Sequence, residues 1–248
     1  MSIYRLTRAK FSPIWIEIAM SIVAVDLMVE HRSTAGVVRA LDPTSLTVES
    51  GGSVAVMGPS GCGKSTLLGL LAGLALPTAG TVAVGDAIVS DLDERHRVQF
   101  RRQRLGMVYQ ADNLLPHLTI EENVGLQLAI CHGDTASDSC QEVARVLDRL
   151  GIGDLAKRLP DQLSGGQRQR AAVARAIIHT PTVMLADEPT GALDGRSAQV
   201  VIELLVEVHR EMGATLVVVT HDPAIAAHLD RTVELRRPVR AQEPSRAG

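Results

Sequence analysis

Uninterrupted apolar runs alternate with amphipathic stretches through most of the chain, a pattern typical of a parallel sheet covered by helices. Each run ends at a polar or glycine residue, and the runs predict buried strands at 54–57, 105–109, 182–186 and 214–219. The stretches of helical period predict helices at 93–104, 165–179, 196–212 and 223–229. In the helix at 196–212, apolar residues follow one face and three glutamates the other, so the apolar face is expected to pack on the sheet.

Two regions depart from this alternation. Strand-like runs at 22–29 and 46–48 are closely spaced without a helix between them, and another run follows at 81–84, which predicts an antiparallel layer. Helices are predicted at 119–130 and 139–150 in a segment without strands. The predicted fold is therefore α/β, with a mostly parallel sheet, an antiparallel β layer and a helical subdomain at about 111–165.

The chain has 248 residues, enough for one α/β domain with a sizeable core, which we expect to span 21–235. Residues 1–20 are expected to be a disordered appendage. They carry three basic residues and an apolar stretch that Glu17 interrupts, with no clean cleavage site, and Met20 and Met28 are alternative start positions. Residues 236–248, rich in Pro and Arg, are expected to form a frayed tail that Leu235 begins.

Composition and charge exclude several classes of protein. With 25 basic and 28 acidic residues the net charge is −3, which gives no sign of a nucleic-acid partner. The apolar run at 67–77 is too short to span a membrane. A local basic cluster is interpreted as a solvated helix face, and it comprises Arg95, Arg97, Arg101, Arg102 and Arg104. Three cysteines without metal-binding spacing are interpreted as reduced thiols of a cytosolic protein, namely Cys62, Cys131 and Cys140.

The strongest chemical signal is a glycine-rich loop between a predicted strand and an apolar helix. It reads Gly58-Pro59-Ser60-Gly61-Cys62-Gly63-Lys64-Ser65-Thr66 and matches G-x-x-x-x-G-K-[ST]. Glycines let backbone N–H groups turn inward around phosphate oxygens, and the following helix directs its positive end at them. Lys64 is predicted to reach the β- and γ-phosphates of a nucleotide, and Ser65 to bind Mg²⁺.

A buried strand ends in two acidic residues, Asp187 and Glu188. Carboxylates at the carboxyl end of a parallel strand lie at the ligand-binding edge of the sheet. Taken alone, an acid at a strand end is an ordinary solvated residue. In a chain with a phosphate-binding loop, we interpret Asp187 as a ligand of Mg²⁺, directly or through its water, and Glu188 as the general base for the attacking water.

A second motif, Leu163-Ser164-Gly165-Gly166-Gln167, lies between the phosphate-binding loop and the acidic strand. Ser164 is a good N-cap, and the glycines leave N–H groups at the helix start uncovered, so this end attracts an anion. With this motif in this order, the chain from about Ile22 to Asp230 resembles the ATP-binding subunits of ABC transporters. The resemblance implies the ABC ATPase form of the P-loop NTPase core.

The resemblance also implies a site shared between two copies of the chain. The helix start at Ser164, Gly165, Gly166 and Gln167 would meet the γ-phosphate of ATP held by the partner's phosphate-binding loop, in a head-to-tail dimer with two-fold symmetry. Three residues that would otherwise be ordinary polar residues gain roles from the resemblance. Gln110 would contact Mg²⁺ and water, His221 would contact the γ-phosphate, and Asp194 would lie in the loop that crosses the dimer interface. The implied cofactors are ATP and Mg²⁺.

One position departs from the family's pattern. The family usually places an aromatic residue before the second strand to stack on adenine, and counting back from Ala40 and Leu41 gives His31. An imidazole offers less stacking area than a larger ring. Two interpretations stay open: His31 stacks weakly on the base, or it is a surface residue of the loop.

Residues 113–119, 122–124 and 186–194 resemble the bacterial group of lipoprotein-release, macrolide-export and cell-division ATPases. The resemblance implies a cytoplasmic ATPase, peripheral on the inner face of the cell membrane. It would drive a separate integral-membrane permease for export or for transmembrane mechanical signalling. Residues 114–116 would line the groove for that permease, or pack in the local core. The alternative function is a soluble ABC ATPase scaffold, as in iron–sulphur cluster biogenesis. The sequence identifies neither the substrate nor the permease.

Overall fold

Two sheets of different type build the molecule in the computed structural model, which describes residues 20–33, 36–132 and 136–237. The antiparallel sheet has the order β2-β1-β4-β5, with β1 at Met20–Ser33, β2 at Gly36–Glu49, β4 at Ala79–Val84 and β5 at Ala87–Ile88. The parallel sheet has the order β6-β7-β8-β3-β9, with β3 at Ser53–Met57, β6 at Leu105–Tyr109, β7 at Val183–Asp187, β8 at Thr215–Val219 and β9 at Arg231–Glu234. The predicted fold class is confirmed.

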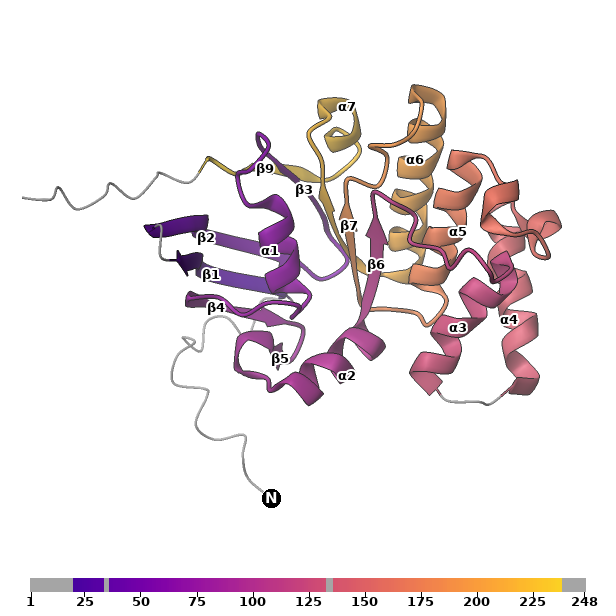
Figure 1. The fold of residues 1–248 in the computed structure, drawn as a ribbon, viewed down its shortest axis with the longest axis horizontal. Helices are drawn as coiled ribbons and strands as arrows, with labels where there is room; N and C mark the ends of the chain where they lie inside the picture. Colours follow the sequence, from indigo (N-terminus) through magenta and orange to yellow (C-terminus); the bar gives the residue numbers. More distant parts are fainter. Residues whose placement is uncertain (1–19, 34–35, 133–135, 238–248) are drawn as a thin grey trace, which may run out of the picture.

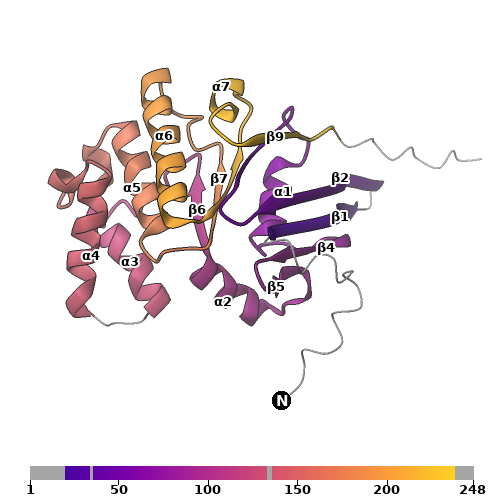
Figure 2. The same cartoon turned by 180° about the vertical axis from the view of Figure 1, so that it is seen from behind.

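Seven α-helices surround these sheets in the described part of the chain. They are α1 at Lys64–Leu71, α2 at Glu94–Arg104, α3 at Ile120–His132, α4 at Ala136–Arg149, α5 at Gly165–Ile177, α6 at Gly195–Met212 and α7 at Pro223–Ala226. Figures 1 and 2 show α3 and α4 at the end of the molecule away from the antiparallel sheet. Within the described residues, every helix is too short or too polar to cross a membrane.

The core lies on both faces of the parallel sheet, because successive side chains of a strand point to opposite faces. On β8, Val217 and Val219 pack with α1 and the antiparallel sheet, whereas Leu216 and Val218 pack with α5 and α6. Helix α1 contacts strands of both sheets and joins them. A sheet buried on both faces reads as a continuous apolar run, which explains why its central strands were predictable.

Polar strands and short elements were not predicted correctly. The hairpin of β1 and β2 pairs from Met20 with Glu49 to Ser33 with Gly36, far beyond the two predicted runs, and most of β2 is exposed or half-buried and lacks an apolar run. Strand β9 was missed because it is a largely exposed edge strand. Leu235, expected to begin a frayed tail, is instead buried and donates its N–H to the Met57 carbonyl over 2.8 Å. The predicted helix at 223–229 is a single turn, and the expected appendage and tail lie mostly outside the described residues.

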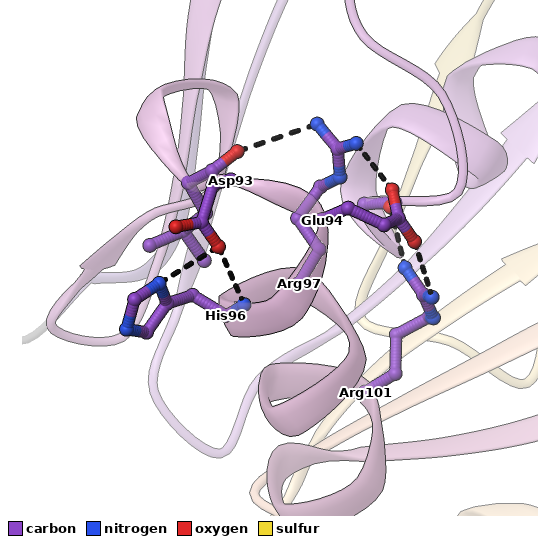
Figure 3. A network of polar contacts seen from close by, with 7 residues as sticks. Asp93, Glu94, His96, Arg97 and Arg101 are labelled. Atoms are coloured by element: carbon purple, nitrogen blue, oxygen red, sulfur yellow. Dashed lines mark hydrogen bonds and ion pairs between the residues drawn. The ribbon is translucent and has the colours of Figure 1, made fainter.

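The basic cluster on α2 is only partly solvated, which corrects the interpretation of its face. Figure 3 shows Arg97 bonded to Glu94 and to the Leu92 carbonyl, while Arg101 donates to the Gly73 carbonyl at 2.7 Å and also contacts Glu94. Asp93 caps the helix by accepting from the His96 N–H. Arg101 therefore fastens α2 to the residue Gly73 just after α1, Arg97 holds the start of α2, and neither arginine is free for an external partner.

Candidate active site

The residues predicted to carry chemistry follow the carboxyl ends of four neighbouring parallel strands. Tyr109 of β6, Asp187 of β7 and Val219 of β8 are paired across the sheet, and Val219 pairs in turn with Val56 of β3. The segments that follow these residues therefore emerge at one edge. They contain Gln110, Glu188, His221 and the phosphate-binding loop that starts at Gly58. This is where open α/β sheets bind their ligands.

The phosphate-binding loop has the backbone of an anion cradle. Its three glycines Gly58, Gly61 and Gly63 have φ of 149°, 76° and 97°, which favour glycine. A Cβ at Gly58 would lie 2.6 Å from both Cys62 Sγ and the Leu235 carbonyl oxygen. Lys64 donates its ammonium to the loop's own Gly58 carbonyl at 2.8 Å, so its charge already lies over the loop. Pro59, Ser60 and Ser65 are exposed, and Thr66 is half-buried.

Glu188 and His221 lie in direct contact. His221 Nδ1 is 2.9 Å and 3.0 Å from the two carboxylate oxygens of Glu188, so the strand ends of β7 and β8 are bridged. Glu188 has φ of 47°, held by a bond from its N–H to the Val219 carbonyl and another from the Gly191 N–H to its own carbonyl. The Gln110 amide packs over this turn, because a Cβ at Gly191 would meet its Nε2 at 3.1 Å. An acid, an imidazole and an amide thus converge beside the loop.

Two oxygen donors at this edge suit a hard divalent cation. Asp187 is half-buried at the end of β7, and Ser65 is an exposed residue in the first turn of α1. Carboxylate and hydroxyl oxygens with water completing the shell are the environment that Mg²⁺ uses beside nucleotide phosphates. The donor set therefore fits this ion.

The second motif forms the start of α5. Ser164 accepts from the Gln167 N–H at 3.3 Å, and the Gln167 side chain accepts from the Ser164 N–H at 2.8 Å, which is a capping box. Cβ atoms at Gly165 and Gly166 would press on Leu193 and Ser197, so glycine permits this close approach to the start of α6. Asp194 caps α6 by accepting from the Arg196 and Ser197 N–H groups, and these bonds, the Ser197 backbone bond foremost, lower its pKa.

The predicted residues thus form two groups. Gln110, Glu188 and His221 gather with the phosphate-binding loop at the sheet edge, while the start of α5 gathers with Asp194 at the start of α6. Among the described residues, no hydrogen bond or ion pair joins Ser164 to the phosphate-binding loop of the same chain.

The position of His31 leaves both of its interpretations open. His31 is exposed on β1 and pairs with Val38 of β2. Two residues beyond Val38, the Ala40 carbonyl approaches the phosphate-binding loop, since a Cβ at Gly63 would lie 2.6 Å from it. The hairpin therefore borders the loop. In the 114–116 segment, Leu114 is buried in the core, as the packing interpretation expects, while Leu115 and Pro116 are exposed, and their place in a permease groove stays a prediction.

Sequence reasoning missed how α5 holds the loop after β6. Gln169 donates to the Tyr109 carbonyl at 2.9 Å, Arg175 donates to the carbonyls of Asp112 and Asn113, and Arg168 contacts the Asp112 carboxylate. Burial lowers the pKa of Arg175. These partners are more than 50 residues apart along the chain, so no local pattern signals them. Arg168 and Gln169 directly follow the second motif, and this position is the sole hint in the sequence that they have a role at the site.

Comparison with known proteins agrees with this geometry. Residues 41–191 match the family model described as ABC transporter. The chain is 43% identical over 203 residues to the lipoprotein-releasing system ATP-binding protein LolD of Legionella pneumophila (strain Lens), covering 82% of this chain and 88% of that protein. It is 45% identical over 199 residues to the macrolide export ATP-binding/permease protein MacB of Hyphomonas neptunium, covering 80% of this chain but 30% of that protein.

Solved structures of similar fold include a cassette that forms a dimer. The dimeric structure of the bacterial ABC transporter cassette MJ0796 superimposes with a TM-score of 0.80 at 36% identity, covering 87% of this chain and 94% of that chain. A post-hydrolysis state of the same cassette bound to ADP and Pi gives a TM-score of 0.79.

The chain belongs to the ABC transporter family, as an ATP-binding subunit. It is an ATPase with the P-loop ABC fold, and the dimeric cassettes fit association driven by ATP. The family resemblance inferred from the sequence is confirmed, including the lipoprotein-release and macrolide-export branch. None of these relatives supports the iron–sulphur scaffold alternative.

Proposed function

We propose that the protein is the ATPase subunit that drives a separate membrane permease, for export or for transmembrane mechanical signalling. The observation that carries the hydrolytic part is the convergence of Gln110, Glu188 and His221 beside the phosphate-binding loop at one sheet edge. We further propose that residues 21–235 form the ATPase domain, with the helical subdomain at about 111–165.

In this proposal each residue of the edge has a defined part in binding or hydrolysis of ATP. The backbone of Gly58–Thr66 and the ammonium of Lys64 hold the phosphates of ATP, and Glu188 accepts the proton of the attacking water. His221 orients the Glu188 carboxylate and contacts the γ-phosphate, while Gln110 positions the water. Ser65, Gln110 and Asp187 hold Mg²⁺, which neutralises phosphate charge when bound.

The site is completed by a second copy. Gly165 and Gly166 present uncovered N–H groups beside Ser164, at a helix start that has no described contact with the phosphate-binding loop of its own chain. A two-fold dimer would place this helix start over the partner's nucleotide, because a self-complementary interface supplies both halves from one sequence. Asp194, at the start of α6 beside the same glycines, would lie at that interface.

An exposed apolar strip supports the permease as partner. Leu126 and Ile130 are one helical turn apart on α3 and exposed, and the Ile130 carbonyl accepts from Arg102 of α2. Exposed Val98 lies one turn before Arg102, and exposed Leu115 is bonded through its N–H to Asn123 of α3. This strip would receive a segment of the permease, which would hold the ATPase on the inner face of the membrane. MacB, by its name, joins an ATP-binding part and a permease in one protein.

The test is the substitution Glu188→Gln, which removes the base and keeps the shape. Turnover should fall by about 10²- to 10⁴-fold while ATP binding stays intact, because only proton acceptance is lost. Phosphate release and nucleotide titration measure the two effects, and the exposed Glu207→Gln on α6 is the control for loss of a carboxylate. Wild-type turnover in Glu188→Gln would contradict the assignment of Glu188 as the base.

A further inference from the structure

One arginine spans the distance between the loop of Gln110 and the helix start at Ser164. Arg168 on α5 donates from Nε to Asp112 Oδ2 at 2.9 Å and from Nη1 to the Leu163 carbonyl at 2.7 Å. Asp112 lies two residues after Gln110, and Leu163 directly precedes Ser164. A single planar group therefore fixes the loop after β6 against the beginning of α5.

Asp112 is held on several sides in this arrangement. Its second carboxylate oxygen, Oδ1, accepts from the Leu114 N–H at 3.3 Å, and its carbonyl accepts from Arg175 at 3.0 Å. The side chains of Arg168 and Asp112 are 35% and 28% exposed, so solvent screens the pair and it adds little to folding stability. Its effect is therefore expected on the alignment of the two segments.

The other contacts between α5 and this loop are of a different kind. Gln169 and Arg175 bond main-chain carbonyls, of Tyr109 in one case and of Asp112 and Asn113 in the other, so they hold the loop whatever its side chains are. The ion pair depends on the side chain at position 112. It can therefore be removed while the rest of the attachment stays in place.

We propose that Asp112 and Arg168 are positioning residues that couple the two nucleotide sites of the dimer. This rests on the proposed function, in which Gln110 serves the chain's own nucleotide and Ser164 serves the partner's. Because the pair makes the loop and the helix start shift together, nucleotide at one site aligns the residues that complete the other. The fixed N–H directions of a guanidinium allow both bonds at once, which a lysine ammonium does not reproduce.

The experiment is a double-mutant cycle of Asp112→Asn and Arg168→Gln, with Arg168→Lys and Asp112→Glu as further variants. ATP-dependent dimerisation is measured by ultracentrifugation in a Glu188→Gln background, and the Hill coefficient of hydrolysis is measured without that background. Each single variant should weaken dimerisation about two- to fivefold and lower the Hill coefficient. The double variant should be no worse than either single variant. ATP binding to the monomer and the midpoint of urea unfolding should stay at the parent values.

The remaining variants sharpen the result. Arg168→Lys should behave like Arg168→Gln because it keeps the charge but loses one bond, whereas Asp112→Glu should recover most of the coupling. The matched control is Glu121→Gln, which removes an ion pair with Lys157 that touches neither segment and should leave the Hill coefficient unchanged. Additive effects of the two single variants, or unchanged dimerisation and cooperativity, would overturn the coupling role alone. A Glu188→Gln parent that stays monomeric with ATP would overturn the shared site and the coupling role with it.

Discussion

Glu188 and His221 illustrate which residue-level properties are readable from the sequence. Their types and positions after apolar runs predict that both lie at one sheet edge, and they do. Their direct contact at 2.9 Å and the left-handed backbone of Glu188 depend on pairing across β7 and β8, with partners 33 residues apart. A local pattern contains no signal for either property, because long-range hydrogen bonds fix both.

His31 provides a test at the same scale. If it stacks on adenine, His31→Tyr should tighten ATP binding by about 1 kcal/mol, near the lower end of the range for a stacked base, because imidazole already contributes part. His31→Ala should weaken binding of ATP more than binding of inorganic triphosphate, which has no base. Titration of the three proteins with both ligands measures this. Identical ATP affinities would mean that His31 is a surface residue and that the base is held elsewhere.

At the scale of elements, one carboxylate ties the edge strand β9 to its neighbour β3. Asp230, just before β9, accepts from both the N–H and the hydroxyl of Ser53 at the start of β3, each at 2.8 Å. These bonds, the one from the Ser53 hydroxyl foremost, lower the pKa of Asp230. The apolar central strands could be predicted from sequence, but β9 could not, because its residues are polar and its place depends on this tie and on pairing with β3.

The tie makes stability depend on pH in a defined direction. A carboxyl whose pKa is lower in the folded state contributes its stabilisation above its unfolded pKa and loses it as the pH falls through the folded value. Asp230→Asn should therefore lower the free energy of unfolding by about 1 kcal/mol or less at neutral pH, since the side chain is 54% exposed. The gap to the wild type should close below about pH 4.

Urea unfolding of both proteins at neutral pH and at about pH 3 measures this gap. The exposed Asp161→Asn is the control for loss of a carboxylate elsewhere on the surface. A gap of the same size at both pH values would show that the charge of Asp230 is not responsible.

At the scale of the whole molecule, the two groups of site residues lie apart in one chain. The start of α5 has no described contact with its own phosphate-binding loop, although both carry features that attract an anion. Order and spacing of the motifs were sufficient to infer the family. The separation within the chain, on which the proposed shared site rests, becomes visible only in three dimensions.

Complementation tests the shared site. Ser164→Arg should leave ATP binding by the monomer near normal but abolish hydrolysis, because its cation would occupy the position of the partner's γ-phosphate. Lys64→Ala should be inactive because its own loop cannot hold the phosphates. A mixed dimer has one intact composite site, so mixing the two inactive proteins should restore activity, to at most about half of the wild-type rate per mixed dimer. Full activity of Ser164→Arg alone would show that the partner's helix start is not used.

The packing around Gly58 restricts which amino acids a mutation can place at that position. Any β-carbon there would enter space already filled by the sulphur of Cys62 and the carbonyl oxygen of Leu235, both 2.6 Å away, on a backbone whose φ of 149° favours glycine. Every amino-acid substitution of Gly58 adds a β-carbon, so every one is expected to disturb this packing. Leu235, distant from Gly58 along the chain, thereby restricts which residues position 58 can accept.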